Sequence, residues 1–383
     1  MKIKSKSSHL LALTSAALSM PAFSAAQPVE TEVSVRTSLY KEENVPADNI
    51  IFGDDVRYDI DIHQFSLLTP VGEKWSLGFN AARESMSGAS PWGTVADADG
   101  AATLIMSGAT ISESRKEFSL STQRYFNKSS LGIEVSRSKE NDYEADAIVL
   151  STEWDSDNKL STLTLGMSYS KDKITPTDAI LFGRVLEKEK TSQSYSLGWT
   201  QILDKTSVLQ SGIRVTKHSG YLTDPYKLRD ARPDERLEWS VNFRYRKFIE
   251  STNAALHTNY RYYEDSYKVR SHTVETAWYQ NIAGNFQLAP NLRYYSQRKA
   301  SFYLPIDDYT LPLTTNQSSD YRLSTFGAFT AGLKAIFNQP TWAVSFSVEN
   351  YKSRGKYSLT NAETEHPALL SFSLASIGFD FRF

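Results

Sequence analysis

The sequence predicts an all-β protein, a single antiparallel transmembrane β-barrel of 16 strands, with 14 or 18 strands as alternatives. Three observations predict this fold. Apolar and polar residues alternate with a period of two in many segments, short and long connections alternate between these segments, and the chain ends in an alternating aromatic pattern. A strand places successive side chains on opposite faces, so this period means one face in apolar and the other in polar surroundings.

The composition excludes several classes of protein. The 383 residues include 42 Lys and Arg against 44 Asp and Glu, so the chain has no basic excess to bind nucleic acid. Aromatic residues make up 12% of the chain, which is too many for a disordered protein. The lack of cysteine excludes a disulfide scaffold, a thiol nucleophile and a cysteine-ligated metal.

The amino-terminal residues have the pattern of a secretory signal peptide. Three lysines precede an apolar run over residues 10–22, and small residues follow as far as Ala26. The run is shorter than the roughly 18 apolar residues that a membrane anchor needs. We therefore expect residues 1–26 to be a signal peptide and residues 27–383 to form the exported barrel.

Sixteen segments carry the alternation. Each is long enough to cross a bilayer at a tilt, which takes about 9–11 residues. The alternatives of 14 and 18 strands arise because two connections, near 140–143 and 264–268, are short. The predicted strands are 31–40, 57–69, 74–83, 116–126, 130–139, 144–154, 159–170, 192–203, 206–217, 236–248, 253–263, 269–281, 285–297, 320–337, 341–351 and 369–383.

The connections between these strands are sorted by length. Outer-membrane barrels have short periplasmic turns and longer extracellular loops in alternation, whereas a soluble sandwich has no reason to sort its loops. Every second connection is only two to four residues long, which places both ends of the barrel in the periplasm. The predicted extracellular loops include 84–115, 171–191, 218–235, 298–319 and 352–368.

Aromatic residues support this orientation. Five tryptophans lie near the predicted periplasmic turns on the apolar phase of their strands, as in the aromatic girdle of a membrane interface. Tyrosines toward the opposite strand ends, Tyr260, Tyr262, Tyr294 and Tyr321, would form the outer girdle. The predicted inner girdle consists of Trp75, Trp154, Trp199, Trp278 and Trp342.

The carboxyl terminus resembles the insertion signal of Gram-negative outer-membrane barrels. Gly378 follows a polar residue by two positions, and aromatic residues occupy the third-last and last positions, Phe381 and Phe383. The resemblance implies insertion by the barrel-insertion machinery into the outer membrane. We then expect the lipid bilayer and lipopolysaccharide to surround the protein.

Seven segments of the chain form a set of motifs, at residues 87–91, 220–227, 232–236, 260–263, 271–273, 293–297 and 322–327. Together they resemble an uncharacterised family of bacterial outer-membrane barrels known only as a domain of unknown function. The resemblance covers nearly all of the chain and implies a barrel of this size with no established activity. Relatives encoded near small lipoproteins and flavin or thiol redox proteins imply a periplasmic lipoprotein or redox partner.

Inward positions on one side of the barrel are rich in arginine and tyrosine. With the apolar phase taken as the outer face, this lining predicts a porin-like channel for small solutes, including anionic ones. The alternative is that the arginines pair with Glu238, Glu275 and Glu349 and only solvate the wall. The candidate lining residues are Arg244, Arg246, Arg261, Tyr263, Arg293, Tyr295 and Arg322.

A second inward stripe of opposite sign is predicted on the second strand. If Ile60 and Ile62 face outward, then Asp59, Asp61 and His63 face the lumen. Balancing the arginine charge is favoured over binding a cation, because one strand rarely supplies a complete metal site. No metal or cofactor site is predicted.

Two loops have distinctive composition. Loop 84–115 contains the apolar residues 101–106, which we expect either to fold into the bore as a constriction or to pack on other loops as an outer lid. The segment 224–236 is dense in charged residues and turn formers, which favours an ion-paired lid.

The sequence leaves two functions open. The first is the porin-like channel, and the second is a non-conducting barrel that serves a periplasmic redox or export system as its outer-membrane component. An enzyme is not predicted, because His218, His257 and His272 stand in no nucleophile motif. The oligomeric state does not follow from the sequence.

Overall fold

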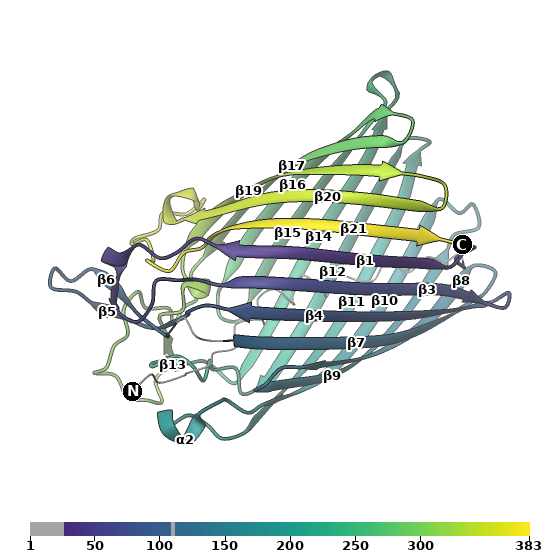
Figure 1. Ribbon diagram of the computed structural model, residues 1–383. Helices are drawn as coiled ribbons and strands as arrows, with labels where there is room; N and C mark the ends of the chain where they lie inside the picture. Colours follow the sequence, from purple (N-terminus) through teal and green to yellow (C-terminus); the bar gives the residue numbers. More distant parts are fainter. Residues whose placement is uncertain (1–26, 109–111) are drawn as a thin grey trace.

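The computed structural model describes residues 27–108 and 112–383, and its main element is a closed barrel of 16 antiparallel strands. The predicted fold class and strand number are confirmed. Neighbouring strands run side by side and tilt across the barrel (Figure 1). The strands are β1 (Glu32–Glu42), β3 (Asp59–Val71), β4 (Trp75–Ser87), β7 (Ser112–Tyr125), β8 (Ser129–Lys139), β9 (Tyr143–Asp155), β10 (Ser161–Ile174), β11 (Lys188–Asp204), β12 (Ser207–Gly220), β14 (Glu235–Ile249), β15 (Ala254–Asp265), β16 (Arg270–Ala283), β17 (Phe286–Arg298), β19 (Phe326–Asn338), β20 (Trp342–Arg354) and β21 (Ser371–Arg382).

The barrel closes between its first and last strands. β1 pairs with β21 from Glu32 opposite Arg382 to Glu42 opposite Phe372. The seam extends past both strands, because the backbones of Thr31 and Phe383 donate to each other at 2.8 and 3.0 Å. Closure leaves no unpaired strand edge, which is what a sheet within a bilayer requires.

Short elements occupy the long loops at one end of the barrel. None of the helices in the described part of the chain is long and apolar enough to cross a membrane. β2, β5 and β6 form a three-stranded sheet, and β13 and β18 pair with each other. The elements are η1 (Ala47–Asn49), β2 (Ile50–Phe52), β5 (Pro91–Ala96), β6 (Ala102–Met106), α2 (Ala179–Phe182), β13 (Asp230–Ala231), η2 (Glu250–Thr252), β18 (Gln317–Ser318), η3 (Tyr321–Leu323) and η4 (Gly355–Tyr357), of which only η2 lies in a turn at the other end.

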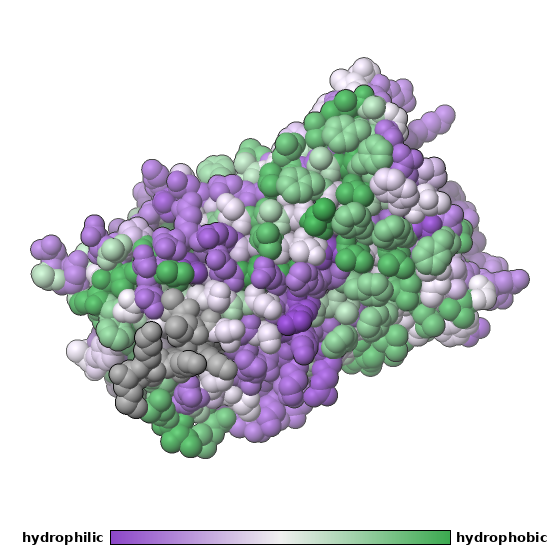
Figure 2. All heavy atoms as spheres, in the orientation of Figure 1, coloured by the Kyte–Doolittle hydropathy of each residue, from purple (hydrophilic) through white to green (hydrophobic). Residues whose placement is uncertain are grey.

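An apolar belt surrounds the outside of the barrel. Val35 on β1, Phe65 on β3 and Phe379 on β21 occupy directly opposite positions in the register, and all three are exposed. Hydrophobic side chains gather over the barrel wall away from the loops, and hydrophilic ones are more frequent toward the loops (Figure 2). Exposed apolar side chains on alternate strand positions suit contact with lipid acyl chains.

The strands extend further toward the loops than the alternation indicates. β4 continues to Ser87 and β7 begins at Ser112, so the loop between them spans 88–111 rather than 84–115. The outward positions toward these strand ends are polar: Arg83 and Lys116 are charged, and the added residues Ser85 and Ser114 continue the same face. The strands therefore continue above the apolar belt, where the outer face meets water and the alternation no longer reads apolar on the outside.

The same change of surroundings above the belt overturns the predicted inward stripe on the second strand, β3 (Asp59–Val71). His63 lies opposite Thr37 and two residues from the outward Phe65, so Asp59, Asp61 and His63 all point outward. Ile60 instead packs inside with Tyr40, Tyr58 and Met86, and this cluster is buried. The prediction was wrong because the inside of this part of the barrel is apolar and the outside is aqueous.

The predicted strand 320–337 begins later than expected. Residues Tyr321–Leu323 form the helix η3, and the Asp320 side chain accepts a hydrogen bond from the Arg322 backbone N–H at 3.0 Å. β19 starts at Phe326. Arg322 and Tyr321 therefore lie in a loop, and neither the inward position of Arg322 nor the outer-girdle position of Tyr321 holds.

Candidate functional site

Arginines from three strands point into the barrel at mid-height. Arg244 on β14, Arg261 on β15 and Arg293 on β17 alternate with outward Phe243, Tyr260 and Leu292. These inward arginines are nevertheless exposed. An inward side chain can be exposed only if the barrel encloses space for water, as expected for 16 strands.

The charges of these arginines are not neutralised by direct ion pairs. Within 27–108 and 112–383, no carboxylate lies within 4.0 Å of Arg244, Arg261 or Arg293. Glu238, one of the expected partners, instead contacts Arg236 at 3.2 Å, and Glu275 lies directly opposite Arg293 in the register without a direct ion pair to it. The interpretation in which the lining arginines only form wall ion pairs therefore does not describe these three side chains.

The remaining candidate lining residues are held by local contacts. Arg246 donates to the backbone oxygens of Tyr245 and Thr258 at 3.0 and 3.3 Å. The Tyr263 hydroxyl donates to Asp265 at 2.8 Å, and the Tyr295 hydroxyl donates to Gln297 at 2.5 Å. These contacts fix the two tyrosines toward the looped end of the bore.

The facing side of the bore is acidic. Glu117 on β7, Glu134 on β8 and Glu153 on β9 point inward, and these strands lie four to eight places from β14, β15 and β17 in the closed strand order, with β8 directly opposite β17. Glu117 is paired with Arg115, whereas Glu134 and Glu153 have no ion pair among the described residues. Opposite charges on facing walls create an electric field across a narrow bore.

Loops anchored on distant strands meet over the outer mouth and form a lid. The loop between β4 and β7 exchanges hydrogen bonds with the loop between β17 and β19: Asp307 N–H donates to Thr94 O at 2.8 Å, and Thr94 N–H donates to Asp307 Oδ2 at 3.2 Å. Leu228, between β12 and β14, donates to Trp92 O at 2.7 Å. Loops from opposite sides of the ring can meet only by crossing the mouth.

The hairpin β5–β6 is the centre of this lid. Leu104 and Met106 have no exposed surface and pack with Ala89 of the same loop and with Val45 and Ala368 from neighbouring loops. The hairpin lies beyond the ends of the barrel strands (Figure 1). Of the two expected arrangements for loop 84–115, this geometry agrees with an outer lid packed on other loops.

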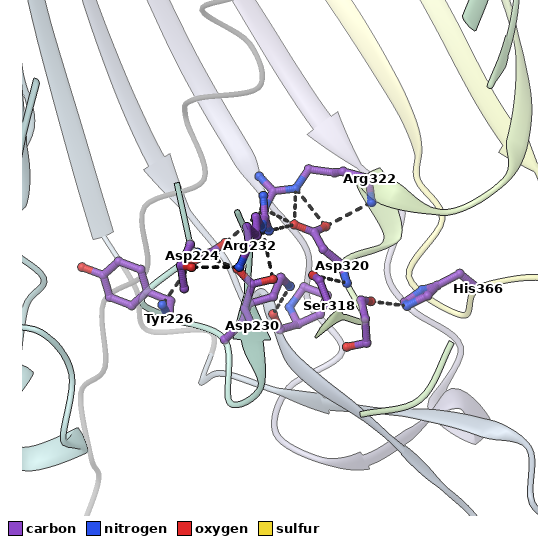
Figure 3. A network of polar contacts seen from close by, with 12 residues as sticks. Asp224, Tyr226, Asp230, Arg232, Ser318, Asp320, Arg322 and His366 are labelled. Atoms are coloured by element: carbon purple, nitrogen blue, oxygen red, sulfur yellow. Dashed lines mark hydrogen bonds and ion pairs between the residues drawn. The ribbon is translucent and has the colours of Figure 1, made fainter. Parts of the chain in front are cut away.

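A charged network ties the lid together (Figure 3). Asp320 lies between two arginines. Arg322 Nε donates a hydrogen bond to its carboxylate at 2.9 Å, and Arg232 Nη2 donates another to the same carboxylate at 2.9 Å. Arg322 also binds Asp224 at 3.0 Å, and Arg232 binds Asp230 at 2.8 Å. The predicted ion-paired lid at 224–236 is confirmed, and Arg322 belongs to it rather than to the lumen wall.

Burial and charge act against each other in this network. Burial alone would raise the pKa of Asp320, but Arg322 and Lys227 hold it well below its usual range. Burial lowers the pKa of His366 to about 4. The neutral imidazole donates from Nε2 to Ser319 O at 2.8 Å and accepts at Nδ1 from Ala368 N–H at 3.0 Å.

Sequence reasoning did not identify Asp320 or His366 as lid residues. The sequence Asp320-Tyr-Arg is typical of a capped turn, because an Asp side chain can accept the N–H two residues on, and it could have indicated η3. No sequence signal marks His366, whose contacts come from loops far apart in the chain. No group of three or more His, Asp or Glu residues in the described part could hold a metal ion, and this includes Asp59, Asp61 and His63.

The tryptophans and the carboxyl terminus lie on the outward phase. Gly378 faces inward opposite Arg36, and a Cβ there would meet Ser345 Oγ at 2.9 Å. Phe381 and Phe383 are exposed on the outer face or beyond the strand end. The five predicted girdle residues, Trp75, Trp154, Trp199, Trp278 and Trp342, all lie near the short-turn ends of their strands.

A closed 16-stranded barrel with an apolar outer belt and a polar, water-accessible lumen has the fold of the outer-membrane β-barrels. The chain belongs to the family described as a protein of unknown function (DUF3570), whose model matches residues 10–374. No curated protein matches the chain.

Solved structures share the fold at low sequence identity. CdiB from Acinetobacter baumannii matches with a TM-score of 0.53 at 8% identity, over 92% of this chain and 60% of that one. The siderophore receptor PirA from Pseudomonas aeruginosa gives a TM-score of 0.48 at 10% identity, over 92% and 62%. The chain thus spans about three fifths of the length of these two proteins.

Proposed function

We propose that this protein is a lidded outer-membrane channel for small solutes that carry an anionic group. The observation that carries the proposal is the set Arg244, Arg261 and Arg293, inward, water-exposed and without carboxylate partners in the described residues. Fixed cations in a bore with low-dielectric walls attract anions, because their field is poorly screened there. The proposed role is transport and not catalysis.

The acidic wall indicates which charge distribution on a solute the bore favours. A small anion alone would follow the arginine side, and Glu134 and Glu153 would orient any cationic group on the same solute toward the other side. The field across the bore therefore favours solutes with separated charges over uncharged ones of the same size.

Single-channel conductance in a planar bilayer tests the proposal, with the reversal potential taken in a salt gradient. Anion preference is expected for the unchanged protein. The variant R244Q/R261Q/R293Q should move the reversal potential toward cation preference, and the matched variant E117Q/E134Q/E153Q on the facing wall should move it the other way. Equal reversal potentials in all three proteins would refute the arginine role.

A second candidate is a non-conducting barrel that serves as the outer-membrane component of a periplasmic redox or export system. The interlocked lid favours it, since loops cross the outer mouth. Deleting residues 97–108 separates the two candidates. A lidded channel gains conductance when its lid hairpin is shortened, whereas a barrel that remains silent after the deletion is not a channel.

The proposed location implies export. We propose that residues 1–26, which lie outside the described residues, are removed as a signal peptide, and that the exposed Phe381 and Phe383 are presented to the barrel-insertion machinery. Replacing Phe383 with a polar residue should reduce the amount of barrel in outer-membrane fractions while leaving export across the inner membrane intact.

A further inference from the structure

Three cationic side chains, with a histidine beside them, stand next to one another on the outside of the barrel, just above the apolar belt. His63 on β3 lies opposite Arg83 on β4, Arg83 lies opposite Lys116 on β7, and Lys116 lies opposite Lys139 on β8. All four are exposed. We refer to His63, Arg83, Lys116 and Lys139 as the cationic row.

Like charges at directly opposite positions in a sheet destabilise it, so a row of them is unusual without a counter-charge. His63 Nδ1 lies 3.2 Å from Thr37 Oγ1, and Lys139 is paired with Glu144. Among the described residues, no carboxylate lies within 4.0 Å of Arg83 or Lys116. The centre of the row therefore lacks a protein counter-charge.

The same level of the outer wall is organised differently further around the barrel. Lys171 pairs with Glu189 at 2.9 Å and Lys173 pairs with Glu187 at 2.8 Å, both between β10 and the start of β11. Cations above the belt thus have carboxylate partners on that side. The missing partners at Arg83 and Lys116 are a local feature of β4 and β7.

An apolar groove lies directly below the cationic row. It is a shallow groove of about 350 Å³, open to the outside and lined by Phe79, Phe118, Leu120 and Val135, with Arg137 and Asp146 at its polar end. The ring of Phe79 stacks against that of Phe118 at 6.4 Å and lies 6.1 Å from that of Phe65. Phe118 is only two residues from Lys116, so groove and row are continuous along one strand.

We propose that the cationic row and this groove bind lipopolysaccharide, with its phosphate groups on Arg83 and Lys116 and an acyl chain in the groove. The phosphates would supply the counter-charge that the protein lacks, because surface cations are attracted to anionic headgroups. The row lies on the side of the long loops, which is the outer-leaflet side in the proposed orientation. The boundary between belt and charges is the depth at which headgroups begin.

Binding of purified rough lipopolysaccharide to the detergent-solubilised full barrel tests this inference. The variant R83Q/K116Q should bind about 30-fold more weakly, the factor for two surface cations. The matched control K171Q/K173Q removes the same charge from paired positions at the same level and should bind like the unchanged protein. The heat-dependent shift in gel mobility shows that all three are folded.

Further probes show whether binding needs the phosphate groups alone or the phosphate groups together with the acyl chain. Dephosphorylated lipopolysaccharide should bind the unchanged protein as weakly as intact lipopolysaccharide binds R83Q/K116Q. Inorganic phosphate and phosphatidylglycerol vesicles should compete poorly, because neither combines several phosphates with the chain that fills the groove. Equal binding by R83Q/K116Q and its control overturns the site, and full competition by inorganic phosphate overturns the assignment to a lipid. Neither result depends on whether the barrel conducts.

Discussion

Two groups of arginines in this barrel have the same chemistry and different surroundings. In the lid, Arg232 and Arg322 each contact two carboxylates, and the central Asp320 has no exposed surface. In the lumen, Arg244, Arg261 and Arg293 lie within 4.0 Å of no carboxylate in the described residues.

The difference follows from access to water. The partly buried guanidinium groups of the lid lose part of their hydration and contact the buried carboxylate of Asp320, whereas a guanidinium in a wet lumen keeps its water. The positive charges of the lid arginines are neutralised by the carboxylates that hold the loops together. Charges of the second group stay available to a passing solute, so pairing distinguishes structural from functional arginines here.

The largest expected effect is on the lid. Asp320→Asn leaves Arg322 and Arg232 without their shared carboxylate, and breaking a buried pair in this way costs about 3–5 kcal/mol. Hydrogen exchange at residues 317–323 should accelerate by at least a hundredfold, while exchange in the barrel strands stays unchanged. Unchanged exchange at the lid would show that the network contributes little.

Acid should weaken the lid at His366. Its pKa in the folded protein is about 4, below the ordinary 6.5, so the unfolded lid takes up the proton first as the pH falls. Stability is therefore fully present above about pH 6.5 and is lost as the pH falls toward 4, by about 3 kcal/mol. Lid exchange measured between these pH values should show this loss.

His366→Gln is the control for that pH dependence. Glutamine can donate and accept hydrogen bonds as the neutral imidazole does, but it does not titrate. Burial and the neighbouring Asp142 raise the pKa of Glu140 to about 8, so that group acts in the opposite direction, with its contribution lost as the pH rises from 4.5 through 8. A loss at low pH that persists in H366Q would show that His366 is not its source.

The lumen arginines should contribute almost nothing to stability. R244Q/R261Q/R293Q is expected to change the free energy of unfolding by no more than about 0.5 kcal/mol per site, as for exposed substitutions elsewhere. Lid exchange should match the unchanged protein even as the reversal potential shifts. A variant with a loosened lid would contradict the separation of the two arginine groups.

The smallest effect is expected at an exposed ion pair on the outer wall. Lys171 and Glu189 contact each other at 2.9 Å with more than half of each side chain exposed, and such pairs contribute little. Lys171→Gln should leave the thermal midpoint unchanged. A measurable drop in the thermal midpoint would mean that exposed ion pairs on the outer wall stabilise the barrel as the lid pairs do.

The sequence predicts the barrel best where lipid imposes a rule. All 16 predicted strands correspond to observed ones, because a hydrocarbon environment forces outward side chains to be apolar along each crossing. Above the belt the rule reverses on β3: Ile60 faces inward and Asp61 faces outward. Alternation is just as regular there, and only the register against β1 shows which phase is inside.

The candidate site was harder to predict for a related reason. Arg244, Arg261 and Arg293 followed from the phase of their strands, since all three lie within the belt. Arg322 sits in an alternating stretch that continues into β19, and its role depends on Asp224 and Asp320. Contacts between loops almost a hundred residues apart leave no periodic trace in the sequence.

The loop contacts across the mouth also have a mechanical consequence. Thr94 and Asp307 connect the β4–β7 side of the rim to the β17–β19 side, and Tyr226 donates to Asp142 to connect β12–β14 to β8–β9. Such cross-links act as struts that resist flattening of the rim into an oval. Lateral pressure from the membrane would then be shared among the loops, and the outer rim would hold a fixed cross-section while the strand ends at the periplasmic turns stay free to deform.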